Sequence, residues 1–247
     1  MKTLFPRRKF IKSALTAGVG SGVLVSGWCA KVMAALNDPV RNRIFSQGIA
    51  SGDPSQNGVV LWTRITTEDI SNVVWQLASD DFFTNILQQG ELTTDPETDH
   101  TVKVEISNLN PGQVYFYRFL VNGITSEPGR TKTLPDGPIE KLSLAVASCS
   151  NYPFGYFNAY EEIAKDKDID FVVHLGDYIY EYGSDGWGAA PGERFNRSHL
   201  PSHEIVSLSD YRERHAQYKS DRASRVMHAS HPLIPTWDDH ESANNPW

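Results

Sequence analysis

Three short polar clusters carry the side-chain types that could do chemistry in this sequence. They are Ala147–Asn151, which contains a cysteine, Gly176–Glu181, which contains an aspartate and two tyrosines, and Asp238–Glu241, which contains two aspartates and a histidine. Thiolates, carboxylates, phenolates and imidazoles bind metals or transfer protons. Each cluster follows a short apolar run, and ligands of open α/β sheets collect beyond the carboxyl ends of parallel strands. Together the three clusters indicate one functional site.

Each candidate residue also has a simpler interpretation. Cys149 alone is more often a small buried hydrophobic residue, Asp177 in a Gly-Asp pair is a common turn residue, and Tyr180 is usually a packed aromatic. Residues 238–240 could form an exposed turn. However, adjacent carboxylates repel each other unless a cation lies between them, and histidine is the usual proton-transfer group near neutral pH.

Three other histidines receive no role in this site. His174 lies inside an apolar run, which is typical of a core residue with a satisfied ring. His199 and His203 lie in a glycine-containing loop, where we expect solvated side chains.

The elements that would position the clusters follow an α/β pattern. Leu142–Ala147 and Phe171–Leu175 are apolar runs without alternation, as expected of strands buried on both faces. Between them, residues 157–166 have helical spacing, and strand–helix–strand predicts a parallel sheet. Further along we predict a long loop at Gly183–Ser202 that is a lid or an insertion, an exposed helix at Ser209–Ser220 and a third strand at Leu233–Trp237.

Residues 44–134 have the texture of a small β-sandwich. Thr101–Ser107 alternates strictly, and Asn122-Gly123 predicts a hairpin turn. Other predicted strands are Gly58–Ile65, Asn72–Ser79 and Gln113–Val121. Leu109–Gly112 before Tyr115 resembles the corner entering a late strand of an immunoglobulin or fibronectin type III sandwich. Residues 126–139, rich in proline and glycine, predict a linker to the next region.

Residues 1–34 read as an export signal. Arg7-Arg8-Lys9 precedes a weakly apolar, glycine-diluted stretch, and Val32-Met33-Ala34 supplies a small-residue cleavage site. The paired arginines resemble a twin-arginine signal, whose machinery exports folded proteins. The apolar stretch is shorter than the roughly 20 residues of a membrane-spanning helix, so we expect no stable membrane anchor. Removal through about Ala34 would leave Cys149 as the one cysteine in a periplasmic or secreted protein.

Composition excludes several classes of protein. The chain has 247 residues, 40% of them hydrophobic, and only 2 cysteines, which excludes a disulfide-stapled miniprotein and argues against wholesale disorder. The net charge is −7, and residues 1–34 hold six basic and no acidic residues, so the remainder is more acidic still. Such a surface disfavours nucleic-acid binding through a basic face and is compatible with metal cations.

The ordered set of features resembles the alkaline phosphatase D (PhoD-like) family. The set comprises the twin-arginine signal, the sandwich, Ala147-Ser148-Cys149, His174–Glu181 and Trp237–Glu241. The resemblance implies an N-terminal immunoglobulin/fibronectin III-like β-sandwich at 44–134, followed by the first half of an α/β metallophosphoesterase domain at 139–247. It also implies a secreted alkaline phosphatase or phosphodiesterase acting on phosphate mono- or diesters through a metal-bound hydroxide.

The resemblance assigns roles to five residues. Asp177 would bridge two metal sites, Cys149 and Tyr180 would bind Fe3+, and Ca2+ would occupy the neighbouring site. Asp239 takes the position where most metallophosphoesterases place an asparagine ligand, and His240 that of the acid for the leaving group. The physics agrees, because two cations neutralise an anionic phosphate ester and lower the pKa of a bound water.

One feature departs from the family pattern. The resemblance implies further Asp and His ligands from the second half of the phosphoesterase domain, and no such cluster follows residue 241. We therefore expect a truncated domain, inactive as 247 residues alone. The alternative is a non-catalytic metal- or phosphate-binding remnant, and a surface-binding sandwich protein would leave the three clusters unexplained.

Overall fold

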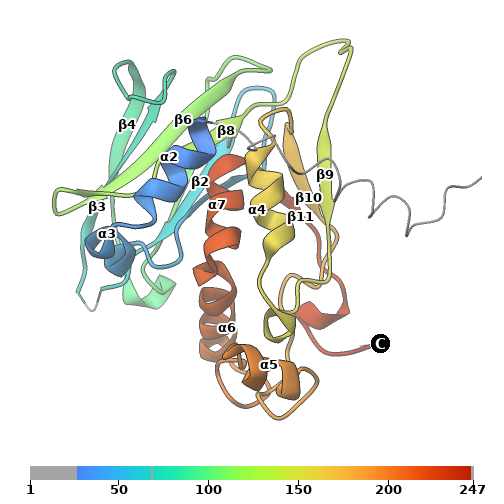
Figure 1. The fold of residues 1–247 in the computed structure, drawn as a ribbon. Coiled ribbons are helices and arrows are strands. Elements are labelled where there is room, and N and C mark those ends of the chain that lie inside the picture. The colour runs from blue at the N-terminus through green and yellow to red at the C-terminus, as the bar shows by residue number, and fades with distance from the viewer. Residues whose placement is uncertain (1–26, 68, 246–247) are drawn as a thin grey trace, which may run out of the picture.

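The computed structural model describes residues 27–67 and 69–245, which form two β-sheets with helices packed on them (Figure 1). One sheet is mixed and six-stranded, in the order β5-β2-β1-β11-β10-β9. The other is antiparallel, in the order β4-β3-β6-β7, with β8 also paired to β6.

The first eight strands confirm that the N-terminal half consists mainly of β-strands. They are β1 (Ile49–Gly52), β2 (Val59–Arg64), β3 (Asn72–Ala78), β4 (Ile86–Thr93), β5 (Thr101–Ile106), β6 (Val114–Val121), β7 (Ile124–Thr125) and β8 (Gly129–Lys132). Alternating residues of β2, β5 and β6 are buried, and they pack with β1 and β3 into one core between the two sheets. The sequence did not predict β1 and β8, which are short, or β4, whose side chains are mostly exposed.

The predicted hairpin turn in this half is confirmed. Asn122 and Gly123 form the turn between β6 and β7, and both have positive φ, as the favoured hairpin turns require. The Tyr115 hydroxyl lies 2.9 Å from the Asn110 amide nitrogen, which donates to it, so the tyrosine ties the preceding corner to the strand.

The second half supplies the predicted strand–helix–strand unit and further helices. Its elements are β9 (Leu144–Ala147), α4 (Asn158–Lys165), β10 (Phe171–His174), α5 (Ala189–Phe195), α6 (Leu208–Ser220), α7 (Arg222–Ser230) and β11 (Leu233–Pro235), with short 3-10 helices η2 (Tyr152–Phe154) and η3 (Asp239–Glu241). A further 3-10 helix, η1 (Pro96–Thr98), lies between β4 and β5 in the first half. β9, β10 and β11 are parallel neighbours, as predicted. The predicted burial on both faces is confirmed for β10 but wrong for β9, which exposes Leu144 and Val146. Helices α4 and α7 lie side by side against the strands (Figure 1).

Three expectations for this half need correction. Helix α5 lies inside the predicted loop, and α6 is not an exposed helix throughout, because its Arg214 and Tyr218 are buried. Helix α7 was not predicted at all. Its apolar residues Ala223, Val226 and Met227 do have helical spacing, but every residue from Ala223 to Ser230 is buried, the polar ones included.

The two halves share one sheet, which the predicted linker at 126–139 did not suggest. β1 pairs in parallel with β11 through Gly52 and Leu233. A buried ion pair joins the Arg225 guanidinium of α7 to the Glu127 carboxylate at 3.1 Å, and Lys132 pairs with Asp170. The sheet that bears the polar clusters is therefore joined to the N-terminal half by strand pairing and by ion pairs.

Helix α2 (Gly27–Ala35) lies within the predicted signal but belongs to the folded body here. Cys29 and Val32 are fully buried in the main core, and α2 packs on α7. It leads into α3 (Pro39–Ile44), which the Asp38 side chain caps. None of the helices in residues 27–67 and 69–245 is long and apolar enough to cross a membrane.

Four buried histidines predict loss of stability in mild acid. Burial lowers the pKa of His199 to about 3 and that of His231 to about 4, and it also lowers the pKa values of His174 and His228. Below the unfolded value of about 6.5, the unfolded chain takes up protons that the folded chain excludes. As the pH is lowered below about 6.5, the free energy of unfolding should therefore decrease, by up to about 1.4 kcal/mol per histidine per pH unit.

Urea unfolding between pH 7.5 and 5 measures this loss. His231→Gln should reduce the pH dependence by about one proton. Equal unfolding free energies at the two pH values would contradict the prediction.

Candidate functional site

The three polar clusters meet at one edge of the sheet, as predicted. His174, the last residue of β10, is paired with Ala147 at the end of β9 and with Pro235 at the end of β11. Since the three strands are parallel and end at one level, the segments that follow them emerge together. This topology brings residues about 90 positions apart into one site.

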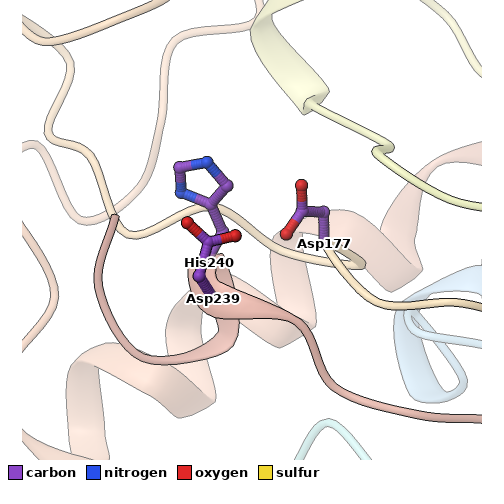
Figure 2. A group of neighbouring side chains, drawn as sticks. All are labelled: Asp177, Asp239 and His240. Atoms are coloured by element: carbon purple, nitrogen blue, oxygen red, sulfur yellow. The ribbon is translucent and has the colours of Figure 1, made fainter. Parts of the chain in front are cut away.

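Asp177, Asp239 and His240 form the centre of the site. One ligand atom from each lies within 4.8 Å of those of the other two. Figure 2 shows Asp177 facing Asp239 and His240 across a small gap. Asp177 and His240 are buried, and Asp239 is half-buried. Such a convergence of two carboxylates and an imidazole suits cation binding and proton transfer.

Tyr180 lies against Asp177, and Cys149 lies beside Tyr180. The Tyr180 hydroxyl donates to Asp177 Oδ2 at 3.1 Å. Burial chiefly raises the pKa of Tyr180, and the neighbouring Asp177 and Cys149 raise it further. Cys149 is exposed and forms no disulfide in the described part of the chain. The phenol is therefore protonated unless a cation stabilises the phenolate.

The backbone at Cys149 and Asp177 is held in a sparsely populated conformation. Their φ values are 58° and 52°, in the left-handed region that non-glycine residues seldom adopt. Two hydrogen bonds between the loops hold it, from the Cys149 amide to the Gly176 carbonyl at 3.2 Å and from the Ser150 amide to the Asp177 carbonyl at 3.0 Å. Strain of this kind, on the order of 1–3 kcal/mol per residue, clusters at functional sites.

Two carboxylates at the site have their own backbone partners. The Asn245 amide donates to Asp239 Oδ2 at 2.8 Å and is the main cause that lowers the pKa of Asp239. Glu181, buried at the end of the second cluster, accepts from the Asn244 amide at 2.7 Å. Both carboxylates are therefore fixed by the segment that follows η3.

Glu181 also orients His240, a role that the sequence did not reveal. Glu181 Oε2 lies 2.7 Å from His240 Nδ1. A carboxylate at Nδ1 keeps that nitrogen protonated and leaves Nε2 to exchange protons. The available signal was the continuation of the second cluster to an acidic residue, but only the folded structure pairs it with a histidine 59 positions away.

Aromatic rings enclose His240. The ring centroids of Tyr180 and Tyr182 lie 4.3 and 5.5 Å from that of His240, and Trp187 stacks on it at 6.5 Å. Trp187 comes from the Gly183–Ser202 segment, so this segment places one ring beside His240. These rings limit water access to the imidazole.

The three histidines that received no role from the sequence lie in different surroundings. His174 is fully buried with its Nε2 2.9 Å from the Tyr160 hydroxyl, which confirms the core position. The ring is only half satisfied, because its Nδ1 has no hydrogen-bond partner among the described residues. The prediction of a solvated His199 is wrong, because that ring is buried 3.1 Å from the Tyr218 hydroxyl. His203 is exposed and pairs with Asp210.

The residues present fit a metal ion. Asp177 Oδ1 is buried and, among residues 27–67 and 69–245, accepts no hydrogen bond. A buried carboxylate oxygen without a partner is costly unless a cation compensates it. Tyr180 and Asp239 offer further oxygen atoms beside Asp177, whereas Cys149 is not among the side chains whose ligand atoms lie within 4.8 Å of one another.

A cavity of about 740 Å³ lies beside the site and not on it. Its lining includes Trp62, Tyr211, Lys219, Trp237 and Glu241, but none of the three central residues. We therefore place the chemistry at the strand ends.

Comparisons with known proteins match both halves of the chain. Residues 30–135 match the model of the PhoD-like phosphatase N-terminal domain, and residues 144–247 match the model of the PhoD-like phosphatase. Alkaline phosphatase D of Bacillus subtilis (strain 168) is 42% identical over 255 residues, covering 98% of this chain and 43% of the relative. A solved structure described as the structure of PhoD superposes with a TM-score of 0.75 at 41% identity, covering 82% of this chain and 40% of that one. The chain thus spans less than half the length of these relatives.

Proposed function

Because this chain belongs to the PhoD-like phosphatase family, we propose that it is a metal-dependent phosphoesterase that hydrolyses phosphate mono- or diesters. The observation that carries the proposal is the convergence of Asp177, Asp239 and His240 at the ends of two parallel strands. The alkaline phosphatase D relative supports the reaction class, since its name describes the same hydrolysis.

We propose that two metal ions, Fe3+ and Ca2+, bind at this site. Asp177 would bind both ions, and Cys149 and Tyr180 would bind the iron. Asp239 would be a further metal ligand, in the position where most metallophosphoesterases place an asparagine. A thiolate and a phenolate suit a trivalent ion, and carboxylate oxygens suit calcium. When bound, the ions would neutralise the phosphoryl oxygens and lower the pKa of a coordinated water.

His240 is the proposed general acid. Glu181 holds its Nδ1, and the rings of Tyr180 and Trp187 keep bulk water from the imidazole. The proton on Nε2 would pass to the oxygen of the departing alcohol, which otherwise leaves as an unstable alkoxide.

Hydrolysis of p-nitrophenyl phosphate and of bis(p-nitrophenyl) phosphate tests this function. The protein expressed from its natural reading frame should release p-nitrophenol from at least one of them. The alternative, a non-catalytic metal- or phosphate-binding remnant, requires metal binding with no release from either substrate.

We also propose that residues 44–134 form an immunoglobulin/fibronectin III-like sandwich and residues 139–247 the first part of a metallophosphoesterase domain. The common core of the two sheets and the hydrogen bond at Tyr115 support the sandwich. The parallel order of β9, β10 and β11 supports the second domain.

Export by the twin-arginine route is a further part of the proposal. Residues 1–26, which carry Arg7 and Arg8, lie outside the described residues. Replacing both arginines by lysine should leave the unprocessed protein in the cytoplasm, because the export machinery reads the pair. Cell fractionation measures this, and unchanged export would contradict the proposal.

The cleavage position bears on the fold. Cleavage after Ala34 would remove α2 and with it the buried side chains of Cys29 and Val32. N-terminal sequencing of the exported protein decides whether this helix is retained.

A further inference from the structure

Glu241 binds the two loops that carry the proposed metal ligands. Its Oε2 accepts from the amides of Asp177 at 2.9 Å and Asp238 at 2.7 Å. Its Oε1 accepts from the amides of Tyr178 at 2.5 Å and Ile179 at 3.3 Å. One carboxylate therefore receives four backbone N–H groups, three from the loop after β10 and one from the loop after β11.

Gly176 reveals how closely those two loops approach. Its φ is 99°, and a Cβ placed there would lie 2.4 Å from the Asp238 amide nitrogen and 2.5 Å from the Asp238 Cβ. Contacts under 3.0 Å force a shift of the backbone. The absence of a side chain at Gly176 thus allows the two loops to approach, and the Glu241 carboxylate links them by hydrogen bonds.

We propose that Glu241 is a positioning residue that fixes the spacing between the Asp177 and Asp239 carboxylates. Each of its oxygens already accepts two amides, so its contribution is to geometry and not to the metal or the substrate. Asp177 is held directly through its own amide, and Asp239 through the neighbouring amide of Asp238. The effect on metal binding rests on the proposed function, whereas the effect on the loops does not.

Glu241→Gln tests the arrangement with almost no change of shape. Both oxygens face two N–H donors, so either orientation of the amide sets its NH2 group against two donors. Amide hydrogen exchange at Asp177, Tyr178 and Asp238 should accelerate at least about tenfold as the loops loosen. Affinity for Ca2+ and for Fe3+, titrated separately into metal-free protein, should fall roughly 10- to 100-fold, as is usual for outer-shell partners.

Two companion variants complete the design. Glu213→Gln, an exposed position on α6, is the matched control and should change neither readout. Gly176→Ala keeps the carboxylate but pushes the loops apart, and it should weaken metal binding in the same direction. It also provides the readout if Glu241→Gln fails to fold by circular dichroism.

The outcomes separate this inference from the proposed function. Unchanged amide exchange and unchanged metal affinity in Glu241→Gln would overturn the positioning role while leaving the metal site intact. Accelerated exchange in a protein whose wild type binds neither ion would support the positioning role and count against the proposed function.

Discussion

Asp177→Asn should abolish phosphatase activity. Asparagine is nearly the same size, tolerates the left-handed backbone at this position, and can still accept the hydroxyl hydrogen bond of Tyr180. What it lacks is the negative charge, and Asp177 Oδ1 is the buried oxygen that a cation would compensate. Because a direct ligand matters more than its outer-shell partners, the loss of turnover should exceed roughly a hundredfold.

Metal content after dialysis and hydrolysis of p-nitrophenyl phosphate measure this effect together. Asp168→Asn, at an exposed position before β10, is the matched control and should keep both. An Asp177→Asn protein with full activity and full metal content would refute the proposed ligand.

His240→Ala should slow hydrolysis by roughly 10²–10⁴-fold while the protein keeps its metals. The reason is that His240 is proposed as the acid for the leaving group and not as a ligand. Glu181→Gln should also slow hydrolysis, but less, because it leaves the imidazole in place and only weakens the hydrogen bond at Nδ1. Turnover and metal content are read on the same samples.

The two readouts also distinguish the alternatives for His240. If His240→Ala loses metal in proportion to activity, His240 is a ligand, and the assigned role is wrong. A substrate with a good leaving group, such as p-nitrophenyl phosphate, should be less affected than an alkyl phosphate, because it needs less help from an acid.

The sequence predicted the framework of the site well for physical reasons. Short apolar runs that flank a helical segment indicate parallel strands, and the carboxyl ends of parallel strands lie together. The expectation that these strands are buried on both faces holds for β10 but not for β9, which exposes Leu144 and Val146. Cys149, Asp177 and Asp239 follow three such runs, so the meeting of the three loops that carry them followed from topology. Tyr180 and His240 lie close along the chain to Asp177 and Asp239.

The partners that hold these side chains could not be predicted in the same way. Glu181 and Glu241 act through hydrogen bonds to residues about 60 positions away, and Trp187 reaches His240 from a segment with no regular pattern. Helix α7 was missed because Arg225 and His228 are buried by pairing with Glu127 and Tyr178, which no periodicity records. Long-range polar contacts of this kind become visible only in the folded structure.

Removal and restoration of metal test the central claim most directly. Protein expressed from its natural reading frame is treated with chelator, and its iron and calcium contents and its rate on bis(p-nitrophenyl) phosphate and p-nitrophenyl phosphate are measured before and after the ions are added back. We predict that the metal-free protein is inactive and that iron and calcium together restore the rate in wild type but not in Asp177→Asn. Hydrolysis at an undiminished rate in protein free of both ions would contradict the account.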